Sequence, residues 1–87
     1  MSVKTVMAIL VQNRRETAEA VQKILTAWGC LIKTRLGIHD GVLENCSDNG
    51  LIILELVGDP NQHKELCEKL NRIPGVKAKY MELSFEE

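Results

Sequence analysis

The sequence predicts an α+β domain of two layers, with a four-stranded antiparallel sheet and two helices on one of its faces. Four strand-like apolar segments and two amphipathic segments follow one another in the order strand, helix, strand, strand, helix, strand. Residues typical of helix starts and helix ends bound both amphipathic segments. The 87 residues are enough for a single domain, 1–87, and its core must be aliphatic because hydrophobic residues make up 45% of the chain but aromatic residues only 3%.

The first half of the chain is expected to form a strand, a helix and a second strand. Residues 3–12 are apolar on both alternating faces, which is typical of a strand that is buried on two sides. Asn13 and Glu16 form a capping-box pattern for the helix, and Gly29 follows its last turn. Residues 31–38 alternate between apolar and polar side chains, which predicts a second strand with one partly exposed face.

The second half is expected to form a third strand, a second helix and a last strand. A mostly polar connection, 39–50, leads into an almost wholly apolar strand at 51–57. Asp59 is placed to cap the next helix, with Pro60 at its first position. Residues 76–84 have lysines on one parity, as is usual for an edge strand. With right-handed crossovers, this order predicts the ferredoxin-like sandwich, with the first and third strands in the centre of the sheet.

The two central strands are apolar on both faces, although helices cover only one face of such a sheet. The other face would therefore expose a large apolar patch. We expect a second subunit to cover it, which gives a homodimer or a homotetramer. The alternative is that a loop or the C-terminal tail of the same chain covers this face.

Composition and motifs argue against several classes of function. The net charge is −1, from eleven basic and twelve acidic residues. We therefore do not expect the chain to bind nucleic acid or a membrane surface. The signatures of nucleophile elbows, nucleotide-binding glycine loops and zinc-protease helices are absent, so we do not expect an enzyme. Because three cysteines are an odd number and no leader-peptide pattern is present, reduced thiols and a cytoplasmic location are expected.

Three chemically reactive side chains are expected to be structural. Cys30 and Cys67 are small residues that suit core or near-core positions. His63 falls on the apolar stripe of the second helix. This position predicts a partly buried structural histidine, or a first-turn surface residue, rather than a ligand.

The densest group of potential ligands lies at the connection between the second and third strands. His39, Asp40 and Cys46 offer an imidazole, a carboxylate and a thiol, which together suit a transition metal ion such as zinc or nickel. The alternative is that His39 and Asp40 only satisfy backbone groups at a strand end and that Cys46 is an ordinary loop thiol. Arg35 either pairs with Glu55 on the neighbouring strand or joins His39 and Asp40 as an anchor for an anionic ligand.

Segments along the whole chain resemble known regulatory families. Those that resemble the ACT regulatory domain are residues 9–14, 20–25 and 29–32. The chain more closely resembles the iron-only hydrogenase system putative regulator family, and residues 35–40, 50–59 and 73–77 carry this resemblance. The resemblance implies an ACT-like fold close to the C-terminal domain of nickel-responsive repressors, an oligomeric assembly, and a regulatory role in an iron-only hydrogenase system.

The similarity to nickel-responsive repressors bears on the candidate site. Those repressors bind metal near the end of the second strand and the start of the third, through histidines and a cysteine. His39 and Cys46 stand in the corresponding region here, and the other histidines of the set are absent. Asp40, Asp48 or a second subunit would therefore have to complete such a site.

Taken together, these patterns predict a non-catalytic regulatory or sensing domain that self-associates and binds a small ligand or a metal ion. The alternative is a structural or adaptor module that binds a partner protein without a small-molecule ligand. Thermal stabilisation by a ligand distinguishes the two, because a ligand that binds the native state raises its stability.

Overall fold

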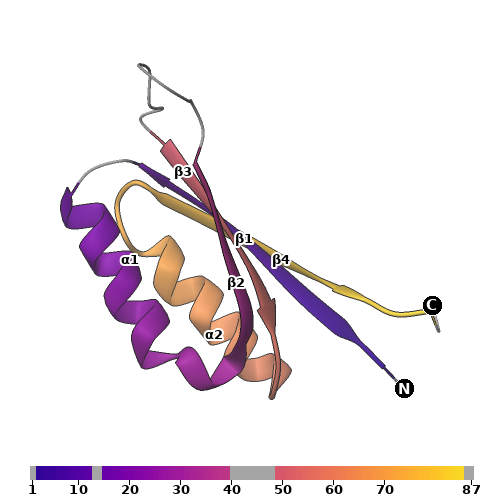
Figure 1. Ribbon diagram of the computed structural model, residues 1–87. Helices are drawn as coiled ribbons and strands as arrows, with labels where there is room; N and C mark the ends of the chain where they lie inside the picture. The colour runs from indigo at the N-terminus through magenta and orange to yellow at the C-terminus, as the bar shows by residue number, and fades with distance from the viewer. Residues whose placement is uncertain (1, 13–14, 40–48, 86–87) are drawn as a thin grey trace.

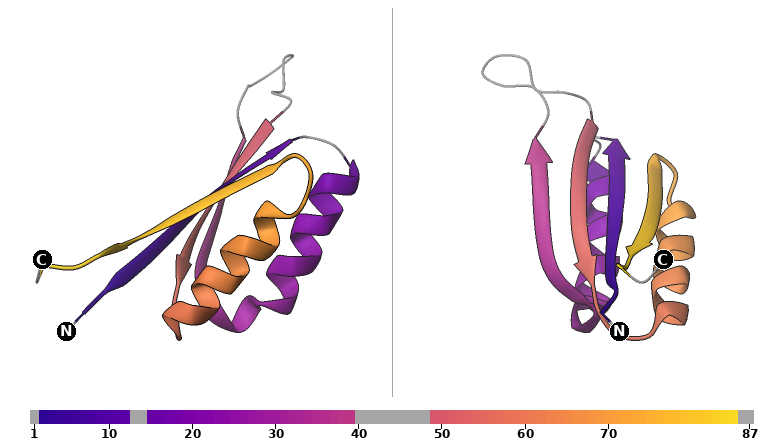
Figure 2. Two further views of the ribbon diagram at one scale, coloured as in Figure 1. Left: turned by 180° about the vertical axis from the view of Figure 1, so that it is seen from behind. Right: turned by 90° about the vertical axis from the view of Figure 1, so that its right-hand side faces the viewer.

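The computed structural model describes residues 2–12, 15–39 and 49–85, and it confirms the predicted two-layer fold. The elements are β1 (Lys4–Gln12), α1 (Arg15–Ala27), a short 3-10 turn (Gly29–Leu31), β2 (Ile32–His39), β3 (Asn49–Leu56), α2 (Pro60–Asn71) and β4 (Val76–Leu83). The strands form one sheet in the order β2-β3-β1-β4, and every neighbouring pair is antiparallel. Both helices lie against the same face of this sheet (Figures 1 and 2).

The core lies between the sheet and the helices, and it is aliphatic as the composition predicts. Alternate residues of the two central strands face the helices, and each helix packs one apolar stripe against them. The most completely buried side chains are Met7, Ile9, Val21, Leu25, Leu54, Leu66 and Leu70. The single tryptophan, Trp28, packs against this cluster from the end of α1.

Local chemistry at the helix and turn boundaries fixes where the elements begin. The side chain of Asp59 accepts a hydrogen bond of 2.9 Å from the backbone N–H of Asn61, and Pro60 opens α2, as predicted. The predicted cap of α1, Asn13, lies outside the described residues. Gly75 adopts a φ of 87° in the turn between α2 and β4, a conformation that residues with a Cβ rarely adopt.

The outer edge of β4 is closed by a side chain of α2. The Asn71 Nδ2 group donates to the Ala78 carbonyl at 2.9 Å, and the Ala78 N–H donates to Asn71 Oδ1 at 2.7 Å. This pair of hydrogen bonds imitates the contact that another strand would make with β4. Addition of a strand at this position of the β4 edge would have to displace Asn71.

The ends of β1 and β4 form a two-stranded arm beyond the end of β3. In the register of the sheet, Thr5 pairs with Leu56 at the end of β3, whereas Lys4 pairs with Leu83 of β4 alone. Figure 2 shows this arm leaving the body of the domain, with the start of β1 beside the end of β4. Neither helix in the part of the chain that the structure describes has the length and apolarity needed to cross a membrane.

Candidate functional site

The predicted ligand group at the end of β2 lies only partly within the described residues. β2 ends at His39, whose backbone is in register with Gly50 at the start of β3. Asp40 and Cys46 lie outside the described residues, so the metal set of His39, Asp40 and Cys46 stays a prediction. In residues 2–12, 15–39 and 49–85, no group of three or more histidine, cysteine, aspartate or glutamate side chains could hold a metal ion.

The predicted ion pair between Arg35 and Glu55 is wrong, because the two residues lie on opposite faces of the sheet. Arg35 is in register with the core residue Leu54, so it belongs to the helix-covered face and is exposed at the sheet edge. Glu55 is one residue further along and faces the other side, where its carboxylate lies 3.7 Å from the ammonium group of Lys4. The other alternative for Arg35, an anchor for an anionic ligand, stays a prediction.

Arg35 and His39 occupy positions of the same parity on β2. Four residues of extended strand separate their Cα atoms by about 13 Å. A ligand that contacts both residues must therefore span much of the length of the strand or draw on the long side chain of Arg35. Arg35 and His39 are the two members of the predicted ligand set that lie within the described residues, and they share one strand.

The face of the sheet that the helices leave uncovered carries four of the large hydrophobic side chains that are exposed among the described residues, Leu10, Leu36, Met81 and Leu83. We call it the open face, and its residues are Lys4, Val6, Ala8, Leu10, Thr34, Leu36, Leu51, Ile53, Glu55, Lys77, Lys79, Met81 and Leu83. Leu36, Met81 and Leu83 each expose more than half of their surface, at 55%, 59% and 54%. The lysines of β4 lie at one margin, which leaves an apolar centre with a polar rim. That composition is typical of a surface that contacts another macromolecule.

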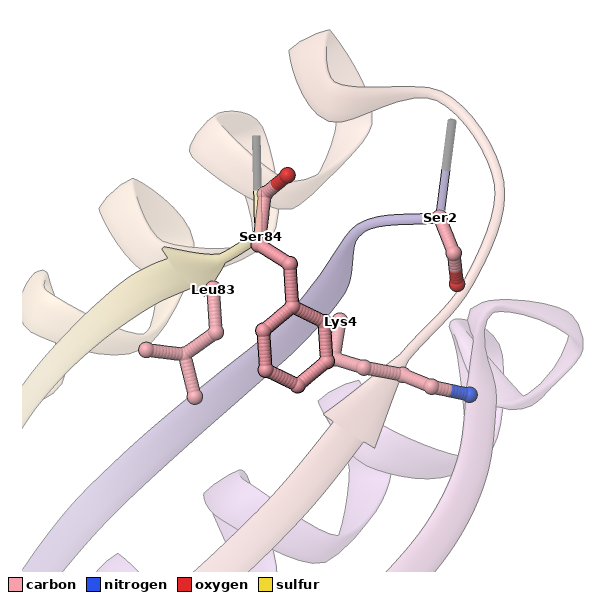
Figure 3. Close-up of a pocket in the computed structure, with 5 residues that line it drawn as sticks. Ser2, Lys4, Leu83 and Ser84 are labelled. Carbon is pink, nitrogen blue, oxygen red and sulfur yellow. The ribbon is translucent and has the colours of Figure 1, made fainter. Parts of the chain in front are cut away.

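The arm forms a hollow at the end of the open face. Figure 3 shows Lys4 and Ser2 at the start of the chain beside Leu83 and Ser84 at the end of β4. Together with Phe85 these residues line a hollow of about 430 Å³. Phe85 itself is fully exposed, which is unusual for a large aromatic side chain and adds apolar surface next to the open face.

His63 is buried in the core layer, as a structural histidine should be. Only 2% of its surface is exposed, and its Nε2 atom lies 2.7 Å from the carbonyl oxygen of Val57. A carbonyl can only accept, so Nε2 carries the proton that is donated. This contact ties the first turn of α2 to the start of the loop that precedes it.

The two described cysteines differ from each other. Cys67 is half-buried against the core, and burial raises the pKa of its thiol, with a smaller raising effect from Glu68 and an opposing hydrogen bond from Asn71. Cys30 is exposed, so the prediction that it is a core or near-core residue is wrong. The reason is local: Cys30 belongs to the 3-10 turn that joins α1 to β2, on the surface of the domain.

Comparison with solved structures supports the fold. The structure titled as the uncharacterized protein TM1266 from Thermotoga maritima superposes with a TM-score of 0.82 at 26% identity, over 95% of this chain and 100% of that one. A formyltetrahydrofolate deformylase from Pseudomonas putida matches with a TM-score of 0.58 at 13% identity, over 90% of this chain but 28% of the enzyme. The de novo designed protein Foldit4 matches with a TM-score of 0.51 at 12% identity, over 94% of this chain and 96% of that one. The last two similarities concern the fold alone.

Comparison of the sequence with family models identifies its relatives. A search among curated proteins gave no match. A family model, TM1266-like, with the description "Iron-only hydrogenase system regulator, putative", matches residues 4–80, which include every strand and helix start of the fold. The chain therefore belongs to the TM1266-like family.

Proposed function

We propose that this chain is a non-catalytic, cytoplasmic regulatory domain that self-associates through its open face and binds a small effector or metal ion at the β2–β3 end. The regulatory role follows the description of the family. The observation that supports self-association is the open face, because monomeric proteins rarely expose so extended an apolar surface. The two parts of the proposal rest on different residues, so they are tested separately.

A second copy of the chain is a suitable occupant of the open face. The two charges that the central strands β1 and β3 place on this face are already balanced, because Lys4 and Glu55 form an ion pair. Lys77 and Lys79 lie at the margin, where they can stay hydrated at the rim of an interface. Asn71 closes the β4 edge at Ala78, so association by adding strands to that edge is hindered. Face-to-face packing about a twofold axis is the arrangement that remains for this half of the sheet.

Sedimentation equilibrium with a pair of matched variants tests this assembly. Leu36→Glu places a charge at an exposed apolar position of the open face on β2, and Gln22→Glu places the same charge on the exposed side of α1. We expect a dimer or tetramer for the wild type and for Gln22→Glu at micromolar concentration, and a monomer for Leu36→Glu. A wild type that stays monomeric up to high micromolar concentration contradicts self-association.

The effector part of the proposal concerns the end of β2. His39 is the last residue of β2, and its backbone is in register with Gly50 of β3. If the effector is a transition metal ion, the competent ligand is neutral imidazole, and affinity falls as the pH drops through about 6.5. If the effector is an anion, protonated His39 and Arg35 bind it more tightly at low pH.

Calorimetric titrations with nickel, zinc and inorganic phosphate separate these two effectors. For a metal ion, His39→Ala should abolish binding, whereas Arg35→Ala should leave it unchanged. For an anion, both substitutions should weaken binding, since both cations contact it. Binding that is unchanged in His39→Ala would show that the β2–β3 end is an ordinary hairpin connection.

An adaptor role is the second candidate, and the arm is the observation that favours it. The hollow between Lys4, Leu83 and the exposed Phe85 is large enough for an apolar side chain of a partner peptide. A monomeric wild type together with no thermal shift from metal ions, phosphate or amino acids would favour this function over the regulatory one.

A further inference from the structure

A second hollow lies at the end of the domain opposite the β2–β3 connection. It has a volume of about 270 Å³ and is lined by Thr5, Val57, Gly58, His63 and Glu82, among others. In the left view of Figure 2, the ends of β1 and β4 leave the body next to the start of α2. The hollow therefore combines the arm, the loop after β3 and the first turns of α2.

His63, which lines this hollow, has one buried ring atom without a hydrogen-bond partner among the described residues. Because His63 donates through Nε2 to the Val57 carbonyl, its Nδ1 atom in the neutral ring is a lone-pair acceptor. Nδ1 is buried and has no hydrogen-bond partner among the described residues. A buried acceptor without a donor is costly, and native proteins usually supply one from the chain, from water or from a ligand.

The polar groups that surround the hollow favour a ligand that donates hydrogen bonds over a ligand that accepts them. Glu82 contributes a carboxylate, in register with Thr5 on the helix-covered face. The first backbone N–H groups of α2 are not free to bind an anion, because Asp59 already accepts their hydrogen bonds. Its side chain accepts from the N–H of Asn61, and its carbonyl oxygen accepts from the N–H groups of Gln62 and His63. Asp59 and Glu82 also make the local charge negative. An anionic ligand would therefore meet repulsion and no free amide donors.

A metal ion fits this hollow less well than an organic cation. His63 and Glu82 are the two lining side chains with strong ligating atoms, and protein zinc sites use at least three such ligands. An ammonium group needs no fixed coordination number and presents three N–H donors. It can satisfy a lone pair and a carboxylate at once.

We propose that this hollow binds a small primary ammonium compound, which donates hydrogen bonds to Nδ1 of His63 and to the carboxylate of Glu82. The site is independent of the effector proposed at the β2–β3 end, since it lies at the other end of the sheet and shares no residue with it. The apolar part of the ligand contacts the backbone and side chains around Val57 and Gly58.

Nitrogen-15 NMR of the two histidine rings tests this proposal on the intact chain. The protein is titrated with propylammonium chloride, and in parallel with 1-propanol and sodium propionate, which have the same carbon chain but a neutral or an anionic end. We expect a saturable shift of the His63 Nδ1 resonance with propylammonium and no shift of His39. The proposal would be overturned by equal responses to all three compounds or by a response of His39 alone. It would also be overturned by the absence of a response of His63, which would mean that a bound water molecule already satisfies Nδ1.

A pair of carboxylate variants gives a second test that does not depend on replacing the buried histidine. Glu82 is exposed, so Glu82→Gln should fold normally while it removes the negative charge. We expect propylammonium to bind about fivefold more weakly to Glu82→Gln. Glu65→Gln, on the exposed side of α2, is the matched control and should bind as the wild type does. Equal affinity in Glu82→Gln and Glu65→Gln would overturn the proposal.

Discussion

The assignment of the two sheet faces can be tested by the same substitution, leucine to alanine, at two positions that lie on neighbouring strands but on opposite faces. Leu54 faces the helices and is 1% exposed, whereas Leu36 lies on the open face and is 55% exposed. Leucine to alanine removes three carbon atoms, worth about 2.4 kcal/mol of transfer free energy when fully buried. A cavity term adds to this at Leu54, so Leu54→Ala should cost about 2–5 kcal/mol. At Leu36 less than half of the transfer term applies, so the cost should be about 1 kcal/mol or less.

Urea unfolding at low protein concentration measures both costs. The single Trp28 packs against the core and reports the transition by fluorescence. The slope of the free energy of unfolding with urea should match the wild type in both variants, so that midpoints compare stabilities directly. Equal costs for Leu36→Ala and Leu54→Ala in the monomer would refute the face assignment. A cost at Leu36 that grows with protein concentration belongs to assembly instead.

Three further predictions concern single side chains and turns. Gly75→Ala should cost about 1–2 kcal/mol because of its positive φ, whereas Gly37→Ala, with open space around the new Cβ, should be neutral or slightly stabilising in chemical denaturation. Asn71→Ala should cost about 1–2 kcal/mol by leaving the Ala78 backbone groups without their partners, and retained thermal stability would show that water replaces them. The pKa of Cys67 in the folded state is raised above the ordinary value of 9.0, so its contribution to stability is present below that pH and is lost as the pH rises through the folded-state pKa. This loss should be absent in Cys67→Ala when unfolding is followed between pH 8 and 11.

The fold could be predicted from the sequence because its determinants are local and periodic. The helix start at Asp59 and Pro60 depends on residues that are adjacent in the chain, and the structure has the same cap. The two-sided apolar pattern of the strand at 3–12 indicated a central position, and β1 is central. Strand boundaries were less accurate, since Leu31 belongs to the 3-10 turn and Asn49 already belongs to β3.

Site geometry was harder to predict because it depends on register and on contacts between distant segments. Whether Arg35 and Glu55 share a face is decided by a shift of one residue, which composition cannot reveal. The hollow at His63 joins residues from both ends of the chain and from α2. One signal was present: Thr5 is polar but has the parity of the core residues Met7 and Ile9, and a polar residue on a core parity indicates a local departure from simple packing.

The arm provides a physical link between the proposed amine site and the proposed assembly. Thr5 and Glu82 face the hollow, and the next residue of each strand, Lys4 and Leu83, faces the open side. Two neighbouring residues of a strand cannot move independently, so a ligand that holds the arm in place also holds part of the assembly surface. Such a ligand should tighten self-association, and by linkage assembly should tighten ligand binding by the same factor. Sedimentation equilibrium with and without propylammonium chloride at equal ionic strength measures this factor, and a factor of one would mean that the arm keeps the same conformation in the free and bound states.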